Sequence, residues 1–267
     1  MKSIYNKYEN FKYYHFTNCI NIPPQIFGSL DYNEDVNDVR INGVYEYHRD
    51  LFEAIEKPCN IEESSYIFEM YMKELFDLSL KVKGKRNGSY LRVLRGWMFN
   101  SDSVEGAVLK GWVESRFGLV PFYHKKPISD IHAEAYYEFM VDKMNKKVNK
   151  NSMYCQLDLL YTYVQQTIRK YFKGYGPTKV FYRGVNNLEE HRILERSGNI
   201  AHIQHNCLTS FTEEKHTAEQ FGDTILSIDV PYTKIFFFSK ALPGHSFTGE
   251  QESLILGGRY LTRILRL

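Results

Sequence analysis

The feature that most limits the fold of this 267-residue chain is a change of texture at Gly174–Pro177. Before this glycine- and proline-rich break, apolar residues recur at helical spacing; after it, short runs of branched and aromatic residues alternate with turn residues. We therefore expect an α+β protein, with a mainly helical part over residues 1–175 and a β-rich part over residues 176–267. A chain of this length can bury both parts in one integrated domain.

Helical periodicity predicts long elements in the first part. One helix is expected from Val104 to Phe117, with Gly118 as its C-terminal cap, and another from Ser152 to Phe172. A third, from about Ile61 to Lys83, has an expected buried stripe of Ile67, Met70, Tyr71, Leu75 and Leu78. A fourth follows Asp130 and ends in the basic segment Lys143–Lys150, and its expected buried residues are Ala133, Tyr136, Tyr137, Met140 and Met144.

The second part is typical of short strands. Branched and aromatic runs predict strands at Lys179–Gly184, Thr224–Val230, Lys234–Ser239, Ser253–Leu256 and Tyr260–Leu267. Short helices are expected between them, at Leu188–Arg196 and Lys215–Phe221.

Composition narrows the class of protein. A net charge of +2 does not favour nucleic acid as the main partner. No uninterrupted apolar segment is long enough to span a bilayer, and the first residues lack the apolar core of a secretion signal. The four cysteines are scattered and are expected to be reduced. We therefore expect a soluble, cytoplasmic protein.

Two carboxylates precede one of the predicted strands. Glu250 and Glu252 stand at i and i+2, so both side chains leave an extended chain on the same face, with Cα atoms about 6.5 Å apart. Two acids held this close repel each other and favour a cationic partner. A solvated strand end is the alternative interpretation, because glutamate is usually exposed.

Two other polar groups lie in the β-rich part. Arg183, in Tyr182-Arg183-Gly184 at a strand end, offers a planar fork suited to phosphate or carboxylate, and Gly184 permits close approach to the backbone. Ser210 and Thr212 alternate on a strand and present hydroxyl groups to one face. Each motif alone is common: the arginine suits an ordinary ion pair, and strand hydroxyls are frequent.

A metal site is not indicated. His202 and His205 have His-x-x-His spacing, but in a loop or strand they would not share a face, and no glutamate partner pattern accompanies them. We expect no metal.

The order and spacing of the arginine, the two hydroxyls and the two acids resemble the arginine, Ser-x-Ser and Glu-x-Glu signature of arginine-specific ADP-ribosyltransferases. Here Thr212 replaces the last serine. Phe221 falls where that family has an aromatic residue that stacks on nicotinamide.

Further blocks are similar to the dinitrogenase reductase ADP-ribosyltransferase family. They are Leu94–Trp97, Glu105–Leu119, Gln156–Tyr161, Tyr182–Asn186 and Phe221–Leu226. The resemblance implies a β-sandwich-like catalytic core, NAD as substrate and reversible inactivation of the nitrogenase iron protein by ADP-ribosylation of one arginine. It also implies a PII-type signalling protein as a partner.

The reaction assigns a role to each residue. Cleavage of the nicotinamide–ribose bond builds positive charge on the ribose, which Glu252 would stabilise while Ser210 orients it. Arg183 would hold the diphosphate or its adjacent ribose, with Gly184, Thr212 and Phe221 completing the NAD site. Glu250 would align the acceptor arginine and take its proton.

Acceptor docking is expected on the helical part, on the helix that contains Trp112 and on the segment Lys143–Lys150, which includes Lys146 and Lys147. Two alternatives stay open: an arginine ADP-ribosyltransferase with another acceptor, and a catalytically idle NAD-binding regulatory module.

Overall fold

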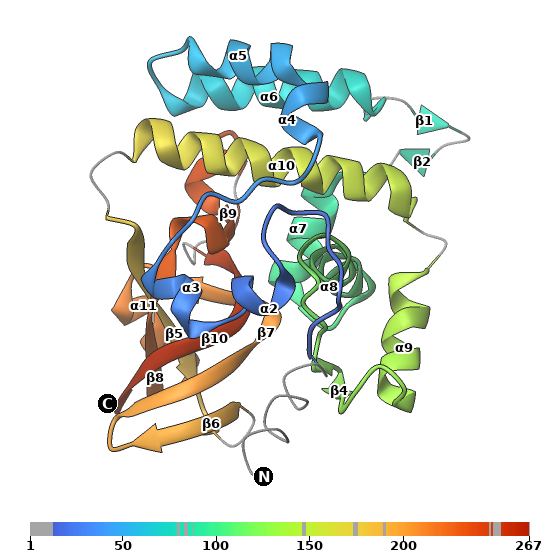
Figure 1. Ribbon diagram of the computed structural model, residues 1–267. Coiled ribbons are helices and arrows are strands. Elements are labelled where there is room, and N and C mark those ends of the chain that lie inside the picture. Colours follow the sequence, from blue (N-terminus) through green and yellow to red (C-terminus); the bar gives the residue numbers. More distant parts are fainter. Residues whose placement is uncertain are drawn as a thin grey trace.

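The computed structural model describes residues 13–78, 81–82, 85–86, 88–145, 148–172, 176–188, 191–245, 247 and 252–266. Within these ranges most helices precede the strands of the large sheet, which confirms the α+β class (Figure 1). The α-helices are α2 Pro24–Phe27, α3 Leu30–Glu34, α4 Val44–Tyr47, α5 Arg49–Glu56, α6 Ile61–Leu75, α7 Tyr90–Phe99, α8 Val104–Phe117, α9 Glu134–Lys143, α10 Lys150–Tyr171 and α11 Lys215–Ala218. The 3-10 turns are η3 Glu219–Phe221, η4 Tyr232–Lys234 and η5 Ser239–Ala241.

The strands form one large sheet and two short hairpins. The large sheet contains β5 Thr178–Val185, β6 Arg192–Ser197, β7 Ile200–Thr212, β8 Thr224–Pro231, β9 Ile235–Phe238 and β10 Glu252–Arg266. Its order is β6-β7-β5-β8-β10-β9 with an additional β7–β10 pairing, and the pairings are antiparallel. The hairpins are β1 Lys81–Val82 with β2 Lys85–Arg86, and β3 Tyr123–His124 with β4 Lys126–Pro127.

Helix α10 joins the helical part to the sheet. Figure 1 shows it between the α5–α6 pair and the C-terminal strands. Its N-terminus is capped by the Asn149 side chain, and its buried side chains bond to backbone around β9. Tyr161 donates to the Thr233 carbonyl at 2.8 Å, and Gln165 donates to the Ile235 carbonyl at 2.9 Å. Because these acceptors lie in connections of the sheet, the two parts share one core.

Strand β10 carries a bulge that lets the N-terminal segment approach the sheet. The pairing with β7 shifts between Leu256 and Gly258, and Gly258 has φ +119°. A Cβ at Gly257 would lie 1.9 Å from the Asn206 carbonyl oxygen, and one at Gly258 would lie 2.9 Å from the Gly28 backbone. The Arg259 amide donates to the Gly28 carbonyl at 2.8 Å. The sequence therefore needs two glycines here, and the two strands predicted around them are one bent strand.

Strands β5 and β7 are joined by one residue pair, Tyr182 with Thr212. On its other edge β5 pairs along its whole length with β8, while β7 pairs along its length with β10. Beyond the single bridge, β5 and β7 therefore diverge. This divergence places the ends of β5, β7 and β10 around one opening.

Several predicted elements are confirmed closely. Helix α8 begins and ends at the predicted residues, Val104 and Phe117, and Gly118 caps it in the left-handed region with φ +71°. Helix α10 agrees with the predicted Ser152–Phe172 within two residues.

The predicted buried faces of α6 and α9 are wrong in part: Ile67, Tyr71 and Leu78 pack against the main core and Tyr136 against a smaller apolar cluster, but other predicted residues do not. The α6 helix buries Ser64, Ser65, Phe68 and Met72, while Met70 and Leu75 are exposed. Ser64 takes a buried place because its hydroxyl donates to the Ile55 carbonyl at 3.0 Å. The α9 helix buries Ala135, Phe139 and Lys143, while Tyr137 and Met144 are exposed.

The basic segment after α9 is only partly described. Lys143 is buried, and its ammonium lies 2.7 Å from Glu114 Oε2. It is therefore engaged inside the protein and does not belong to a docking surface. Lys146 and Lys147 lie outside the described residues.

The helix predicted at Leu188–Arg196 is also wrong, because this region contributes the edge strand β6. Its side chains are mostly exposed and it pairs with β7 alone, so its pattern lacks the buried alternation that predicts a strand.

Within the described residues, no helix combines the length and apolarity needed to cross a membrane.

Burial disfavours the charged form of Lys234, which is fully buried. Lys234 donates to Asn33 Oδ1 at 2.6 Å, and its nitrogen lies 4.7 Å from the Tyr260 ring centroid and 5.2 Å from that of Phe27. Burial lowers the pKa of Lys234 well below its usual value. The unfolded chain therefore binds one more proton than the folded chain between this lowered pKa and the ordinary lysine pKa of about 10.4.

We expect the free energy of unfolding of the wild type to rise with pH relative to Lys234→Met over that window. The relative slope approaches about 1.4 kcal/mol per pH unit, because unfolding takes up a proton only in the wild type. Urea unfolding from pH 7 to pH 10 measures it, with the exposed Lys240→Met as control. A stability difference between wild type and Lys234→Met that does not change with pH would contradict this prediction.

Candidate active site

The opening where β5 and β7 diverge is a cavity of about 400 Å³. Strands β5, β7 and β10 supply three walls, α11 and η3 a fourth, and the C-terminal end of α7 closes the remaining side. The sequence-predicted site residues that line it are Arg183, Gly184, Ser210, Thr212, Phe221 and Glu252. The structure therefore brings six candidates from separate motifs to one place. The seventh, Glu250, lies outside the described residues.

The pairing of β7 with β10 places the acid beside the hydroxyls. Glu252 is directly opposite Thr212, and Leu254 is opposite Ser210. Side chains two residues apart on a strand share a face, so Glu252 and Ser210 are diagonal neighbours, with Cα atoms about 7–8 Å apart. This arrangement allows the serine and the carboxylate to act on one ligand.

Ser210 is held from two directions. The indole Nε1–H of Trp97 donates to Ser210 Oγ at 2.9 Å, and Arg183 Nη1 donates to the Ser210 carbonyl at 2.8 Å. Because Ser210 Oγ accepts the indole hydrogen bond, its own O–H stays available as a donor on the cavity side. Trp97 thus fixes the orientation of the hydroxyl group.

Arg183 retains unused hydrogen-bonding capacity. Its Nε atom is buried and makes no hydrogen bond, although Nη1 is engaged with Ser210. Burial lowers the pKa of the guanidinium from its usual value, and the Glu252 carboxylate acts in the opposite direction. A buried cationic donor such as Arg183 Nε is unfavourable without an acceptor, so this atom favours an anionic ligand.

Gly184 and Thr212 have structural partners as well as a place in the cavity. A Cβ at position 184 would lie 1.9 Å from the Ala218 carbonyl oxygen, so glycine is required for α11 to pack on the end of β5. The Thr212 hydroxyl accepts a hydrogen bond from the Glu214 amide at 3.2 Å, in the turn that leads to α11. Their motifs therefore also build the wall that carries Phe221.

Aromatic side chains lie at the rim of the cavity. Phe221 of η3 has 47% of its surface exposed, and Phe99 at the end of α7 has 94% exposed. Phe221 was predicted as a site residue; Phe99 and Trp97 were not. Trp97 belongs to the block Leu94–Trp97, which contributed to the family resemblance. Its position in the cavity depends on how α7 packs on β7.

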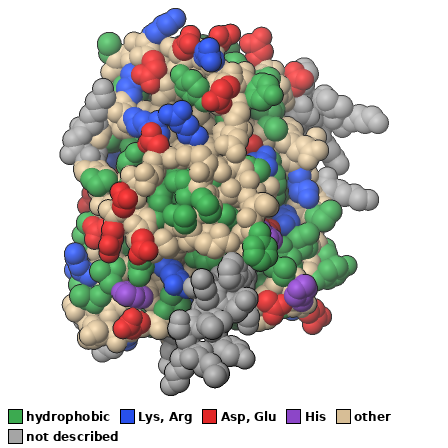
Figure 2. All heavy atoms as spheres, viewed as in Figure 1, with side chains coloured by type: hydrophobic (Ala, Val, Ile, Leu, Met, Phe, Trp, Pro, Cys, Tyr) green, Lys and Arg blue, Asp and Glu red, His purple; other side chains and the backbone are tan. Residues whose placement is uncertain are grey.

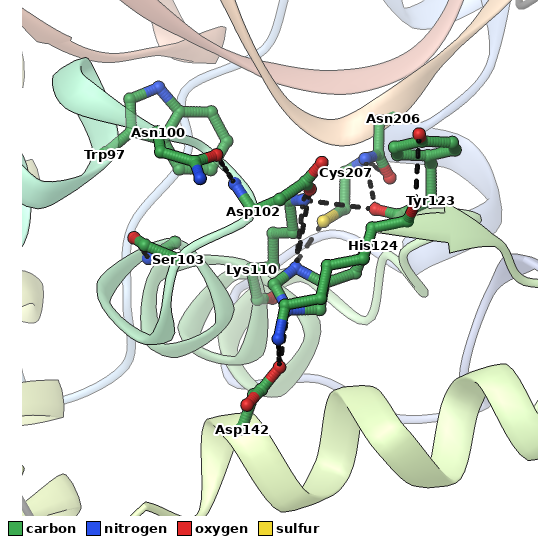
Figure 3. A network of polar contacts seen from close by, with 12 residues as sticks. Trp97, Asn100, Asp102, Ser103, Lys110, Tyr123, His124, Asp142, Asn206 and Cys207 are labelled. Carbon is green, nitrogen blue, oxygen red and sulfur yellow. Dashed lines mark hydrogen bonds and ion pairs between the residues drawn. The ribbon is translucent and has the colours of Figure 1, made fainter.

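A buried polar network supports the α7 end of the cavity (Figure 3). Lys110 is buried and donates to Asp102 Oδ1 at 2.8 Å, to the Tyr123 carbonyl at 3.1 Å and to His124 Nδ1 at 3.3 Å. Its ammonium lies 5.7 Å from the Trp97 ring centroid. Since an ammonium group only donates, His124 Nδ1 accepts, and its Nε2–H therefore faces Asp142 Oδ2 at 3.2 Å.

The charges of this network are fixed by its contacts. Burial and the Lys110 ammonium lower the pKa of His124, so the imidazole is neutral near pH 7. Burial alone would raise the pKa of Asp102, but the hydrogen bond and the charge of Lys110 reverse this effect and lower it. The network therefore consists of a stable Lys110–Asp102 ion pair braced by a neutral imidazole.

A second cavity of about 280 Å³ adjoins the first. The two share Trp97, Ser101, Arg183 and Ser210 as lining residues. Lys110, Asp102 and Gln204 also line the second cavity. Arg183 therefore lies where the two cavities meet.

The described residues contain no group of three side chains arranged to hold a metal ion. His202 lies 3.6 Å from Glu195, whereas His205 packs against the rings of Tyr260 and Phe211.

Comparison with known proteins agrees with this geometry. The sequence profile of dinitrogenase reductase ADP-ribosyltransferase matches residues 17–264. The chain is also 37% identical over 260 residues to the NAD(+)--dinitrogen-reductase ADP-D-ribosyltransferase of Rhodospirillum rubrum, covering 93% of this chain and 94% of the relative. No solved structure matches the chain. A match over nearly the whole length, with the signature residues gathered in one cavity, shows that the chain belongs to the dinitrogenase reductase ADP-ribosyltransferase family.

Proposed function

We propose that this protein transfers ADP-ribose from NAD to an arginine of dinitrogenase reductase, the nitrogenase iron protein. The observation that carries the proposal is the convergence of Arg183, Ser210 and Glu252 on one cavity. The Rhodospirillum rubrum relative, matched over 94% of its length, is named for this donor and this acceptor. The choice of arginine as the acceptor side chain rests on the signature and on the chemistry of the paired acids.

Glu252 is the group that stabilises the reacting ribose. The bond between the nicotinamide nitrogen and ribose C1′ breaks, nicotinamide leaves with the electron pair, and positive charge develops on the sugar. A carboxylate fixed beside the sugar offsets this charge and can accept a hydrogen bond from the 2′-hydroxyl. Ser210, whose O–H is left free by Trp97, is the donor that orients the carboxylate.

Arg183 is the diphosphate ligand. Its buried Nε has no partner, and it lies where the two cavities meet. A dinucleotide is long and carries its two phosphates near the middle. An arginine where the two cavities meet suits the position of the two phosphates. Phe221, at the rim of the first cavity, suits an exposed ring such as nicotinamide.

Glu250 completes the transfer. A new bond forms between C1′ and a guanidinium nitrogen of the acceptor, and the proton of that nitrogen must leave. Glu250 lies outside the described residues, and its proposed role rests on its i, i+2 spacing from Glu252, which would put both carboxylates on one face of an extended chain. No metal ion is needed for this scheme.

The helical part, residues 1–175, is proposed to complete the NAD cleft and to contact the acceptor, while residues 176–267 form the catalytic core. The contribution of α7 to the cavity supports this division. A cytoplasmic location is proposed because Cys19, Cys59, Cys155 and Cys207 are all free thiols.

Incubation of the protein with labelled NAD and purified dinitrogenase reductase tests the proposal. Label on the reductase is the expected result. In a parallel incubation with a cell lysate, label on other proteins only would show a different acceptor. NAD binding without any transfer in either incubation would show an inactive regulatory module.

The two acids should separate in their effects. Glu252→Gln should lower both NAD hydrolysis and transfer to protein by at least about 100-fold, the usual effect of removing a group that stabilises transition-state charge. Glu250→Gln should retain NAD hydrolysis while transfer is lost, because hydrolysis needs no acceptor alignment. Glu195→Gln, on the outer strand β6, is the matched control. Normal transfer by both variants would refute the assigned roles.

Trp97 should act through Ser210. Trp97→Phe keeps most of the ring volume but removes the indole donor, so we expect kcat to fall about 3- to 10-fold in both reactions, the effect of one hydrogen bond. The KM for NAD should stay within about twofold, since Arg183 is unchanged. Trp112→Phe is the matched control: it removes an indole bond to Asp158 in the core and should lower stability without lowering kcat. Equal losses of kcat in both variants would argue against a positioning role.

A further inference from the structure

Phe99 is an exposed aromatic side chain at the mouth of the catalytic cavity. Ninety-four per cent of its surface is exposed, and it lines the same cavity as Glu252. Single exposed apolar residues are common on protein surfaces and need no explanation by themselves. The position of Phe99 is different, because any macromolecule that presents a side chain to Glu252 must cover this rim.

The backbone position of Phe99 is fixed by helix α7, which carries it. Helix α7 is capped by the Ser89 side chain, and the Asn100 amide closes its last turn on the Gly96 carbonyl at 2.9 Å. Trp97, two residues earlier, is buried against Ser210. The last turn of α7 therefore points one aromatic residue into the site and presents the next one to solvent. The backbone of Phe99 is therefore ordered before a partner covers the ring, and only its two side-chain torsions lose freedom on binding.

The positive charge of Arg95, beside Phe99, indicates which kind of partner surface would bind here. Arg95, one turn earlier on the exposed face of α7, is positively charged and bonds to His245 Nδ1 at 3.4 Å. A partner surface that provides a carboxylate for Arg95 beside an apolar area for Phe99 would suit this rim.

We propose that Phe99 is the apolar anchor for the protein acceptor, dinitrogenase reductase, and that it contributes to acceptor binding and not to NAD binding. This inference rests on the proposed function. It places acceptor recognition on α7, where Arg95 supplies the charge and Phe99 the apolar contact. Phe221, on the opposite wall of the cavity, remains with the nucleotide.

The test compares Phe99→Ala with wild type in two assays: NAD hydrolysis without acceptor, and transfer to dinitrogenase reductase. Truncating a buried anchor should raise the KM for the reductase about 10- to 100-fold. The KM for NAD and the rate of NAD hydrolysis should stay within about twofold. Phe99→Tyr keeps the ring and should stay near wild type.

Tyr47→Ala is the matched control, because Tyr47 on α4 is also strongly exposed, at 87%, and does not line the cavity. It should leave both assays unchanged. An unchanged KM for the reductase in Phe99→Ala would overturn the proposal, as would a parallel rise in the KM for NAD, which would make Phe99 part of the nucleotide site. If wild type hydrolyses NAD but leaves the reductase unlabelled, the proposed acceptor fails, and the anchor role for that acceptor fails with it.

Discussion

The pairing register of β7 with β10 is the constraint on which the site depends. It sets Glu252 opposite Thr212, and so places the carboxylate and the Ser210 hydroxyl on one face. A slip of one residue would turn Glu252 to the other face of the sheet. The bulge at Gly258 and the close approach of Gly257 to Asn206 hold this register, because neither contact survives a shift. Two glycines without any chemical role thus fix the position of the acid.

The sheet alone does not complete the site. Ser210 reaches its orientation through Trp97, which comes from the helical part, and the ammonium of Lys110 lies beside the Trp97 ring. Lys110 is in turn fixed by Asp102 and by a neutral His124. A buried lysine without these partners would be costly, so the network is stable only when it is complete. The helical and β-rich parts therefore depend on each other for the geometry of a single hydroxyl group.

The sequence was sufficient where local signals decide the structure. Gly118 could be predicted as a helix cap because its left-handed backbone is a local requirement, and Arg183, Ser210 and Glu252 could be found from their order along the chain. The buried faces of α6 and α9 could not be fully predicted, because Ser64 and Lys143 bond to partners on other elements: Ser64 to Tyr171, 107 positions away, and Lys143 to Glu114, 29 positions away. Trp97 could not be predicted as a site residue for the same reason, because its partner Ser210 lies 113 positions away.

The site has a division between its interior and its rim. The interior groups belong to strands whose register ties them to one another, so a change in one displaces the rest. Phe99 and Arg95 are exposed residues of α7, with Phe99 at the mouth of the cavity and Arg95 bonded to His245. Substitutions on this outer face can alter the contact with a protein partner while Trp97, on the inner face, keeps Ser210 in place. On the proposed roles, α7 therefore carries acceptor recognition on its outer face and the support of Ser210 on its inner face.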